Sequence, residues 1–228
     1  MIRRALILDT ETTGVASTDS VIELGLVLYS VEHQTTLIQF SALRRCTTGN
    51  PAAHINRISP AALADFDLAL DCDSIALDLL APADVVVAHN AAFDRQFFDG
   101  PWHEKDWLCT QTDFRWPAQT RANESLVSLA LAHGIGVASA HRALTDCQLI
   151  ASLFDRMTDL QAMFATAMRP KKLYRAIVEY PQRQLAKDAG FQWNAPGYEK
   201  MWTRRLTPEE AAAMPFYVAP IAEVASVR

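Results

Sequence analysis

The order in which strand-like and helix-like segments follow one another constrains this chain more than any other feature of its sequence. Three apolar, β-branched runs come first, at residues 5–9, 21–29 and 35–42, and Gly14 marks a turn between the first two. This close spacing predicts an antiparallel meander. Later segments alternate between helix and strand, and the run 84–88, which is apolar after Asp84, is typical of a parallel strand buried on both faces. We therefore expect an α/β fold with a mixed sheet, and helices at residues 73–80, 90–98, 126–132 and 142–157, with one more after the Ser59-Pro60 N-cap.

Four carboxylates and one histidine stand at the ends of these segments. Asp9 and Glu11 lie two residues apart at the end of the first strand, so their side chains point to the same face. Asp94 follows the parallel strand, and Asp146 lies on a later helix, with His141 in the loop before it. Each residue alone has an ordinary explanation: a surface acid, an acid favoured by a helix dipole, or a solvent-facing ring.

Together, these five residues fit a two-metal site for phosphoryl transfer. Carboxylate oxygens are hard ligands that suit Mg²⁺ or Mn²⁺ rather than zinc. Two such ions, roughly 3.5–4 Å apart, stabilise both the attacking and the leaving oxygen of an in-line displacement. The histidine would then be the general base that deprotonates the attacking water.

Three sequence stretches carry a family resemblance. Residues 8–14 (LDTETTG), 88–94 (AHNAAFD) and 141–146 (HRALTD) resemble, in order and spacing, the three exonuclease motifs of the DEDDh family. That family includes the proofreading subunit of bacterial replicative DNA polymerase, exonuclease X and ribonuclease T. The resemblance covers roughly residues 1–160 and implies a ribonuclease H-like fold with a mixed five-stranded sheet.

The resemblance also implies a role for each matching residue. Asp9, Glu11 and Asp146 would bind the first of two Mg²⁺ or Mn²⁺ ions, Asp9 and Asp94 would serve the second, and His141 would be the general base. Substrate contacts are implied for five further residues: Thr12 and Thr13 through their backbone amides, and His89, Asn90 and Phe93 along the cleft. The family often has IHGIT where residues 55–59 read INRIS, which puts substrate contacts there in doubt but not the chemistry.

Charge is distributed unevenly along the chain. Residues 1–168 hold 11 Lys/Arg against 20 Asp/Glu, whereas residues 169–205 hold 9 against 3. The composition beyond Pro170 is basic and aromatic, with Trp193 and Trp202. We expect an exonuclease domain at residues 1–165 and a small module at residues 166–228 whose basic residues grip a nucleic-acid backbone. The aromatic residues have a simpler explanation, which is that both tryptophans and Phe191 build the module's core.

The remaining composition places the chain in the cytoplasm. No apolar run approaches the roughly 20 residues of a membrane span, and the apolar stretch near the N-terminus is too short for a secretory signal. The 4 cysteines contain no CxxC pair, which argues for reduced thiols rather than a zinc or redox site.

The sequence therefore predicts a metal-dependent 3′–5′ exonuclease that releases nucleoside monophosphates from single-stranded or frayed DNA ends. Two alternatives stay open: an exoribonuclease that trims RNA, and a proofreading subunit docked on a DNA polymerase. The chain shows no recognisable clamp-binding peptide, and its sequence leaves the oligomeric state open.

Overall fold

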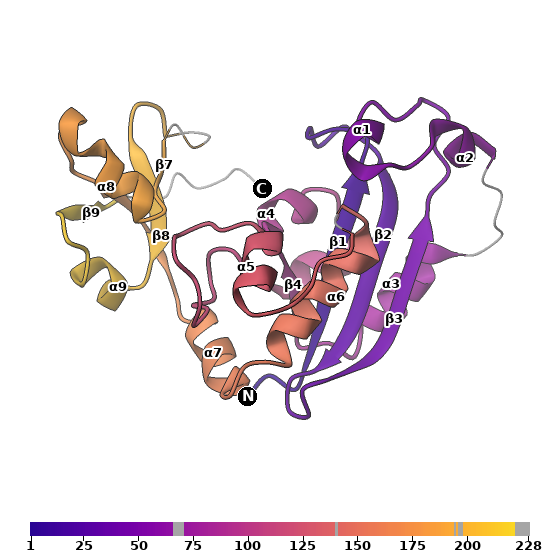
Figure 1. Ribbon diagram of the computed structural model, residues 1–228, viewed down its shortest axis with the longest axis horizontal. Coiled ribbons are helices and arrows are strands. Elements are labelled where there is room, and N and C mark those ends of the chain that lie inside the picture. Colours follow the sequence, from indigo (N-terminus) through magenta and orange to yellow (C-terminus); the bar gives the residue numbers. More distant parts are fainter. Residues whose placement is uncertain (66–70, 140, 194, 196–197, 222–228) are drawn as a thin grey trace. The chain divides into compact units, whose positions relative to one another are not determined.

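The computed structural model describes residues 1–65, 71–139, 141–193, 195 and 198–221. These residues form two compact units, one of residues 1–119 and 124–167, the other of residues 120–123 and 168–228. No helix in the described ranges is long and apolar enough to cross a membrane. Each unit is described separately below (Figure 1).

The first unit contains a five-stranded sheet in the order β3-β2-β1-β4-β5. Strands β1 to β3 are antiparallel, whereas β4 is parallel to both β1 and β5. The expected meander and mixed sheet are thus confirmed. Its strands are β1 (Arg4–Thr12), β2 (Val21–Ser30), β3 (Thr35–Leu43), β4 (Val85–Ala88) and β5 (Asp106–Cys109). Its helices are α1 (Ala53–Asn56), α2 (Pro60–Asp65), α3 (Cys72–Leu80), α4 (Ala91–Arg95), η1 (Gly100–Glu104), α5 (Leu126–Ala132), α6 (Ala143–Phe154) and α7 (Leu160–Ala167).

Helices cover both faces of this sheet, as Figure 1 shows for α6 on one face and α3 on the other. Even-numbered residues of β1 and β2, such as Leu6 and Leu26, pack against α3. Odd-numbered residues face α6, because side chains alternate along a strand. On that side the ring of Tyr29 lies 5.6 Å from that of Phe154, measured between centroids. Asp9 and Glu11 are odd-numbered, so this alternation turns both carboxylates toward α6.

Helix α6 approaches the sheet most closely at Gly25. A Cβ atom at this position would lie 2.3 Å from the carbonyl carbon of Ala143 and 2.5 Å from the nitrogen of Leu144, which is closer than real Cβ atoms come. The absence of a side chain at Gly25 therefore allows the first turn of α6 to rest directly on β2. Because Gly25 pairs with Asp9 across the sheet, this contact brings the first turn of α6 next to Asp9.

Several elements differ from the sequence expectation at their ends. The helix expected at residues 90–98 ends at Arg95, and a separate 3-10 turn begins at Gly100, whose φ is 59°. The helix expected at residues 142–157 begins at Ala143, because Arg142 is its extended N-cap residue, and ends at Phe154, before its C-cap residue Asp155. Strand β5 and helix α7 were not expected individually, since both are short and their apolar residues form no long periodic pattern.

The second unit contains a four-stranded antiparallel sheet in the order β7-β8-β6-β9. Its elements are β6 (Lys172–Ala176), η2 (Tyr180–Gln182), α8 (Arg183–Asp188), β7 (Gln192–Trp193), β8 (Trp202–Leu206), α9 (Pro208–Ala212) and β9 (Val218–Pro220). Phe191 is buried in its core and Trp202 packs against that core, whereas Trp193 is 49% exposed. The expectation that these aromatic residues build the core of the module is therefore confirmed for Phe191 and Trp202 and is wrong for Trp193.

We predict that Gly25→Ala lowers the free energy of unfolding by about 1–3 kcal/mol, the usual cost of overpacking a core, because α6 must move away from β2. Urea unfolding of the purified protein measures this change. Gly136→Ala is the matched control, since a Cβ there meets no atom within 4 Å. Equal stability of the two variants would show that the contact between Gly25 and α6 is not tight.

Candidate active site

Three carboxylates meet where the end of β1 faces the first turn of α6. One oxygen each from Asp9, Glu11 and Asp146 lies within 4.8 Å of the others. Asp9 and Glu11 share one face of β1, and Asp146 follows Ala143, the residue that rests on Gly25. The sequence expectation that these three side chains converge is therefore met by the geometry of the structure.

The three carboxylates are partly buried and close together, so their negative charges repel one another. Burial, followed by the charges of Asp94, Asp146 and other acids, raises the pKa of Asp9 far above its usual value. Burial and the charge of Asp146 raise the pKa of Glu11 to about 7. Burial also raises the pKa of Asp146, and the charge of His141 partly offsets this. A cation bound among the carboxylates would remove this repulsion.

The donor set fits a hard divalent cation. All three groups offer carboxylate oxygens, the ligands preferred by Mg²⁺ and Mn²⁺. Oδ1 of Asp146 is buried and has no hydrogen-bond partner among the described residues. An unpartnered buried carboxylate oxygen is costly unless a ligand completes its coordination.

Asp94 lies outside this group of three but within electrostatic reach of it. Its Oδ1 accepts hydrogen bonds from the main-chain nitrogen (3.0 Å) and the hydroxyl (2.8 Å) of Thr10, the residue between Asp9 and Glu11. Burial raises the pKa of Asp94 to about 7, although the bonds from Thr10 favour its charged form. These hydrogen bonds thus hold Asp94 at the strand end that carries Asp9 and Glu11. They are made by Thr10, whose side chain lies on the opposite face of β1 from those two acids.

His141 occupies the loop before α6, as the sequence predicts. It is exposed and its φ of 62° lies in the left-handed region. Its main-chain N–H and its charge both act on the carboxylate of Asp146, which places it beside the acidic cluster.

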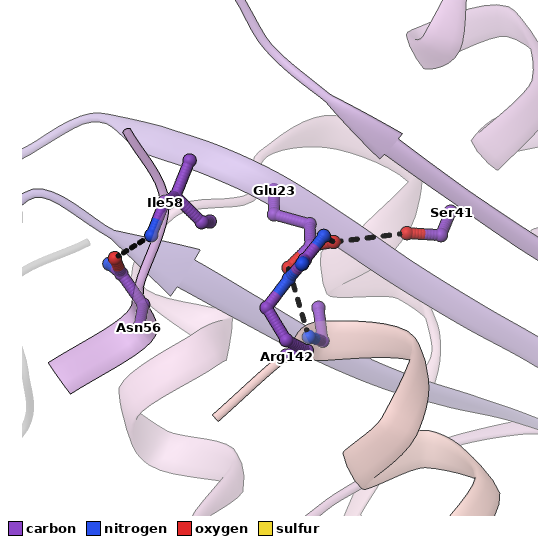
Figure 2. A network of polar contacts seen from close by, with 6 residues as sticks. Glu23, Ser41, Asn56, Ile58 and Arg142 are labelled. Atoms are coloured by element: carbon purple, nitrogen blue, oxygen red, sulfur yellow. Dashed lines mark hydrogen bonds and ion pairs between the residues drawn. The ribbon is translucent and has the colours of Figure 1, made fainter. Parts of the chain in front are cut away.

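Glu23 holds this loop in place, and sequence reasoning missed it. Figure 2 shows the buried Glu23 carboxylate between Arg142 and Ser41. It accepts two hydrogen bonds from the Arg142 guanidinium, at 2.7 and 2.9 Å, and one from the main-chain nitrogen of Ala143, at 3.1 Å. The signal in the sequence was a single acid inside the otherwise apolar run 21–28. This ion pair ties the residue after His141 to strand β2.

Thr12 is the last residue of β1 and Thr13 begins the turn that follows, and both are buried. The Thr13 main-chain N–H donates to the carbonyl of Ser20 at 3.0 Å, so the expected nucleotide contact would have to share or replace that bond. The amide of Asn56 donates to the carbonyl of Thr12 at 3.3 Å, and its oxygen accepts from the Ile58 nitrogen, the bond drawn in Figure 2. The segment that departs from the family pattern thus supports this turn. Arg57 stands where the family pattern has glycine, and its φ of 58° lies in the left-handed region.

The other three expected substrate residues follow β4. Nδ1 of His89 lies 2.9 Å from the hydroxyl of Thr110, and burial lowers the pKa of His89 to about 4, so its ring is neutral at pH 7. Asn90 is the exposed, left-handed N-cap residue of α4. Phe93 is half-buried, with its ring edge-on to that of Phe97.

A family model described as "Exonuclease" matches residues 6–154, which is more than half of the chain. The chain belongs to the exonuclease family. It is a phosphodiester hydrolase of the 3′–5′ exonuclease class. The family match confirms the resemblance that the three motifs carry. A second family model, described as "Domain of unknown function (DUF8626)", matches residues 172–221.

Individual relatives agree with this assignment. The DNA polymerase III subunit epsilon of Treponema pallidum (strain Nichols) is 30% identical over 164 residues, which are 65% of this chain and 74% of that protein. A structure of exonuclease X in complex with 5′ overhanging duplex DNA is 27% identical, with a TM-score of 0.54 over 72% of this chain and 99% of that one. E. coli exonuclease I with a dT13 oligonucleotide is 15% identical and shows the fold alone, with a TM-score of 0.58 over 77% of this chain and 48% of that one. The ribonuclease H-like fold is thereby confirmed.

The pKa shifts predict how the metal-free protein responds to pH. Glu11 and Asp94 have ordinary values of 4.5 and 3.8 and rise to about 7 in the folded chain, so the folded state binds protons more tightly than the unfolded state. In EDTA, stability should therefore fall as pH rises from about 4.5 to 7, by on the order of 3 kcal/mol from Asp94 alone. Added Mg²⁺ should restore stability at pH 7, because it binds only the folded state.

Urea unfolding at several pH values, with and without Mg²⁺, measures the slope of the free energy of unfolding against pH. Asp94→Asn should flatten it. Asp84→Asn is the control: burial raises the pKa of Asp84 less than the hydrogen bonds from the Arg4 and Arg3 nitrogens lower it, so Asp84 titrates below this pH range. A metal-free protein equally stable at pH 5 and pH 7 would contradict the prediction.

Proposed function

We propose that this chain is a metal-dependent 3′–5′ exonuclease that releases nucleoside monophosphates from single-stranded or frayed DNA ends. The observation that carries the proposal is the convergence of Asp9, Glu11 and Asp146, with Asp94 joined to the same strand end. We further propose that residues 1–165 are the catalytic domain and residues 166–228 an accessory module, and that the enzyme acts in the cytoplasm.

The proposed site holds two ions, Mg²⁺ or Mn²⁺. Asp9, Glu11 and Asp146 would bind one ion, and Asp9 with Asp94 the other. When bound, the ions supply Lewis-acid stabilisation of the oxygens of the scissile phosphodiester. The pKa of Glu11 and Asp94, near 7 without metal, would fall on binding, so that both act as anions.

His141 is the proposed general base. It accepts a proton from the attacking water, whose oxygen bonds to the phosphorus while the bond from phosphorus to the 3′ oxygen of the preceding nucleotide breaks. That oxygen takes a proton from solvent, which leaves a free 3′-hydroxyl on the strand and releases a nucleoside monophosphate. The ion pair of Glu23 with Arg142 limits the movement of the loop that carries this histidine. Thr12, Thr13, His89, Asn90 and Phe93 are the proposed contacts with the terminal nucleotide.

DNA is favoured over RNA by what the relatives act on. The Treponema relative is a DNA polymerase subunit, and the exonuclease X structure contains duplex DNA. The first of these also supports a second candidate role, in which the chain is the proofreading subunit of a DNA polymerase. An exoribonuclease remains the other outcome of the assay below, because the active-site residues do not distinguish the two sugars.

Degradation of matched 5′-labelled DNA and RNA strands tests the proposal directly. We expect stepwise shortening from the 3′ end with Mg²⁺ or Mn²⁺ and none with EDTA. Replacing any one of Asp9, Glu11, Asp94 or Asp146 with Ala should reduce the rate to the level seen in EDTA. Asp78→Ala, at an exposed position of α3, should leave the rate unchanged. Full activity of Asp94→Ala would argue most strongly against two ions, and faster shortening of RNA would reassign the substrate.

His141→Ala should slow hydrolysis by about 10²–10⁴-fold, the usual contribution of a general base, while Mn²⁺ binding stays largely intact. The pH–rate profile should lose its acidic limb, because no imidazole then has to be deprotonated. Single-turnover rates over a range of pH, together with calorimetric titration of Mn²⁺, separate the two effects. Loss of Mn²⁺ binding in this variant would identify His141 as a metal ligand instead.

A further inference from the structure

The second unit contains a pocket of about 580 Å³ formed by the end of β6, the segment that follows it, the start of α8 and the hairpin of β7 and β8. This volume lies within the range of roughly 300–1,000 Å³ that is usual for ligand sites. The described residues that line the pocket all belong to one unit, and none of them belongs to the site proposed above.

Two of the aromatic residues that line this pocket are largely exposed rather than part of the unit's core. Trp193 is 49% exposed and Tyr180 is 77% exposed. The ring of Trp193 lies 5.4 Å from that of Trp202, between centroids, and Trp202 in turn packs against the core. Trp202 thus packs against both Trp193 and the core, and the exposed ring of Trp193 offers a flat apolar surface to a ligand.

Cationic side chains accompany these rings. Arg175 lines the pocket from an exposed position on β6. The Arg183 guanidinium carbon lies 4.0 Å from the centroid of the Tyr180 ring, and one of its nitrogens donates to the Tyr180 carbonyl at 3.0 Å, which holds the ring and the charge together. The acid in the lining is Glu179, within a segment that carries 9 Lys/Arg against 3 Asp/Glu.

Flat rings beside guanidinium groups fit one ligand chemistry better than others. Unpaired nucleobases stack on aromatic faces, and their phosphates pair with arginine. A fully paired duplex keeps its bases stacked on one another and could not use the rings of Trp193 and Tyr180 in this way. We propose that this pocket binds single-stranded nucleic acid, with bases stacked on Trp193 and Tyr180 and phosphates at Arg175 and Arg183. The choice of ligand rests on the proposed exonuclease function.

Binding by the full chain in EDTA, where the proposed hydrolysis is blocked, tests this site. The probe is a labelled DNA strand of about 30 nucleotides, longer than the roughly 4–16 nucleotides that one small binding domain covers. Trp193→Ala should weaken binding by about tenfold, as expected for the loss of one stacked base. Tyr217→Ala is the matched control, because Tyr217 is 71% exposed in the same unit but lies outside the pocket, and it should bind like the wild type.

Two further variants separate a binding role from a structural one. Arg175→Ala should reduce the slope of log affinity against log salt by about one, the expected effect of losing one phosphate contact. Trp193→Phe should keep most of the affinity, since it retains a ring, but lose part of the quenching of tryptophan fluorescence by the strand. Urea unfolding of each variant verifies that it folds like the wild type.

The outcomes distinguish this proposal from the exonuclease proposal. Unchanged affinity and salt slope in both Trp193→Ala and Arg175→Ala would overturn the pocket, even if the enzyme degrades DNA normally in Mg²⁺. Trp193-dependent binding by a chain that degrades no strand in any metal would retain the pocket and overturn the exonuclease. Equal binding of RNA would support the pocket, because stacking does not read the sugar.

Discussion

Repulsion among partly buried carboxylates is the constraint on which the first unit of this structure depends. The negative charges of Asp146 and Glu11 raise the pKa of Asp9, and that of Asp146 raises the pKa of Glu11, so these side chains would separate if their backbones were free. Three contacts between residues far apart in the sequence hold the segments that carry these acids in place. The first turn of α6 rests on Gly25, Glu23 binds both Arg142 and Ala143, and Thr10 holds Asp94. The free energy gained from the apolar packing of α3 and α6 on the two faces of the sheet offsets the electrostatic repulsion in this arrangement.

Part of this arrangement could be predicted from the sequence because it depends on local geometry. The alternation of side chains along a strand places Asp9 and Glu11 together, and a loop before a helix explains how His141 and Asp146 can converge. The strand expected at residues 84–88 was recognisable as parallel because residues 85–88 are apolar on both faces. The motif resemblance then joined these separate segments into one predicted site and one fold. The family match and the similar structures confirm the family and the fold.

The remainder depends on contacts between residues far apart in the chain, which local patterns do not contain. Gly25 looked like any glycine in a strand until the position of Ala143 was known. Glu23 looked like an isolated acid, and Asn56 like a departure from a motif, until their partners were visible. In the second unit, composition predicted the positive charge, but not that Trp202 packs against the core while Trp193 remains exposed, because both are equally apolar in the sequence.

The ion pair between Glu23 and Arg142 has a consequence for how this chain can vary. The two residues are 119 positions apart, and the carboxylate is buried whereas the guanidinium is half exposed. Replacing the arginine alone would leave an unpaired negative charge inside the sheet, close to Asp9, Glu11 and Asp146. Replacing the glutamate alone would leave the first amide of α6 without its acceptor. Relatives that have lost one partner should therefore have lost or exchanged the other, so that the pair is inherited as a single coupled character.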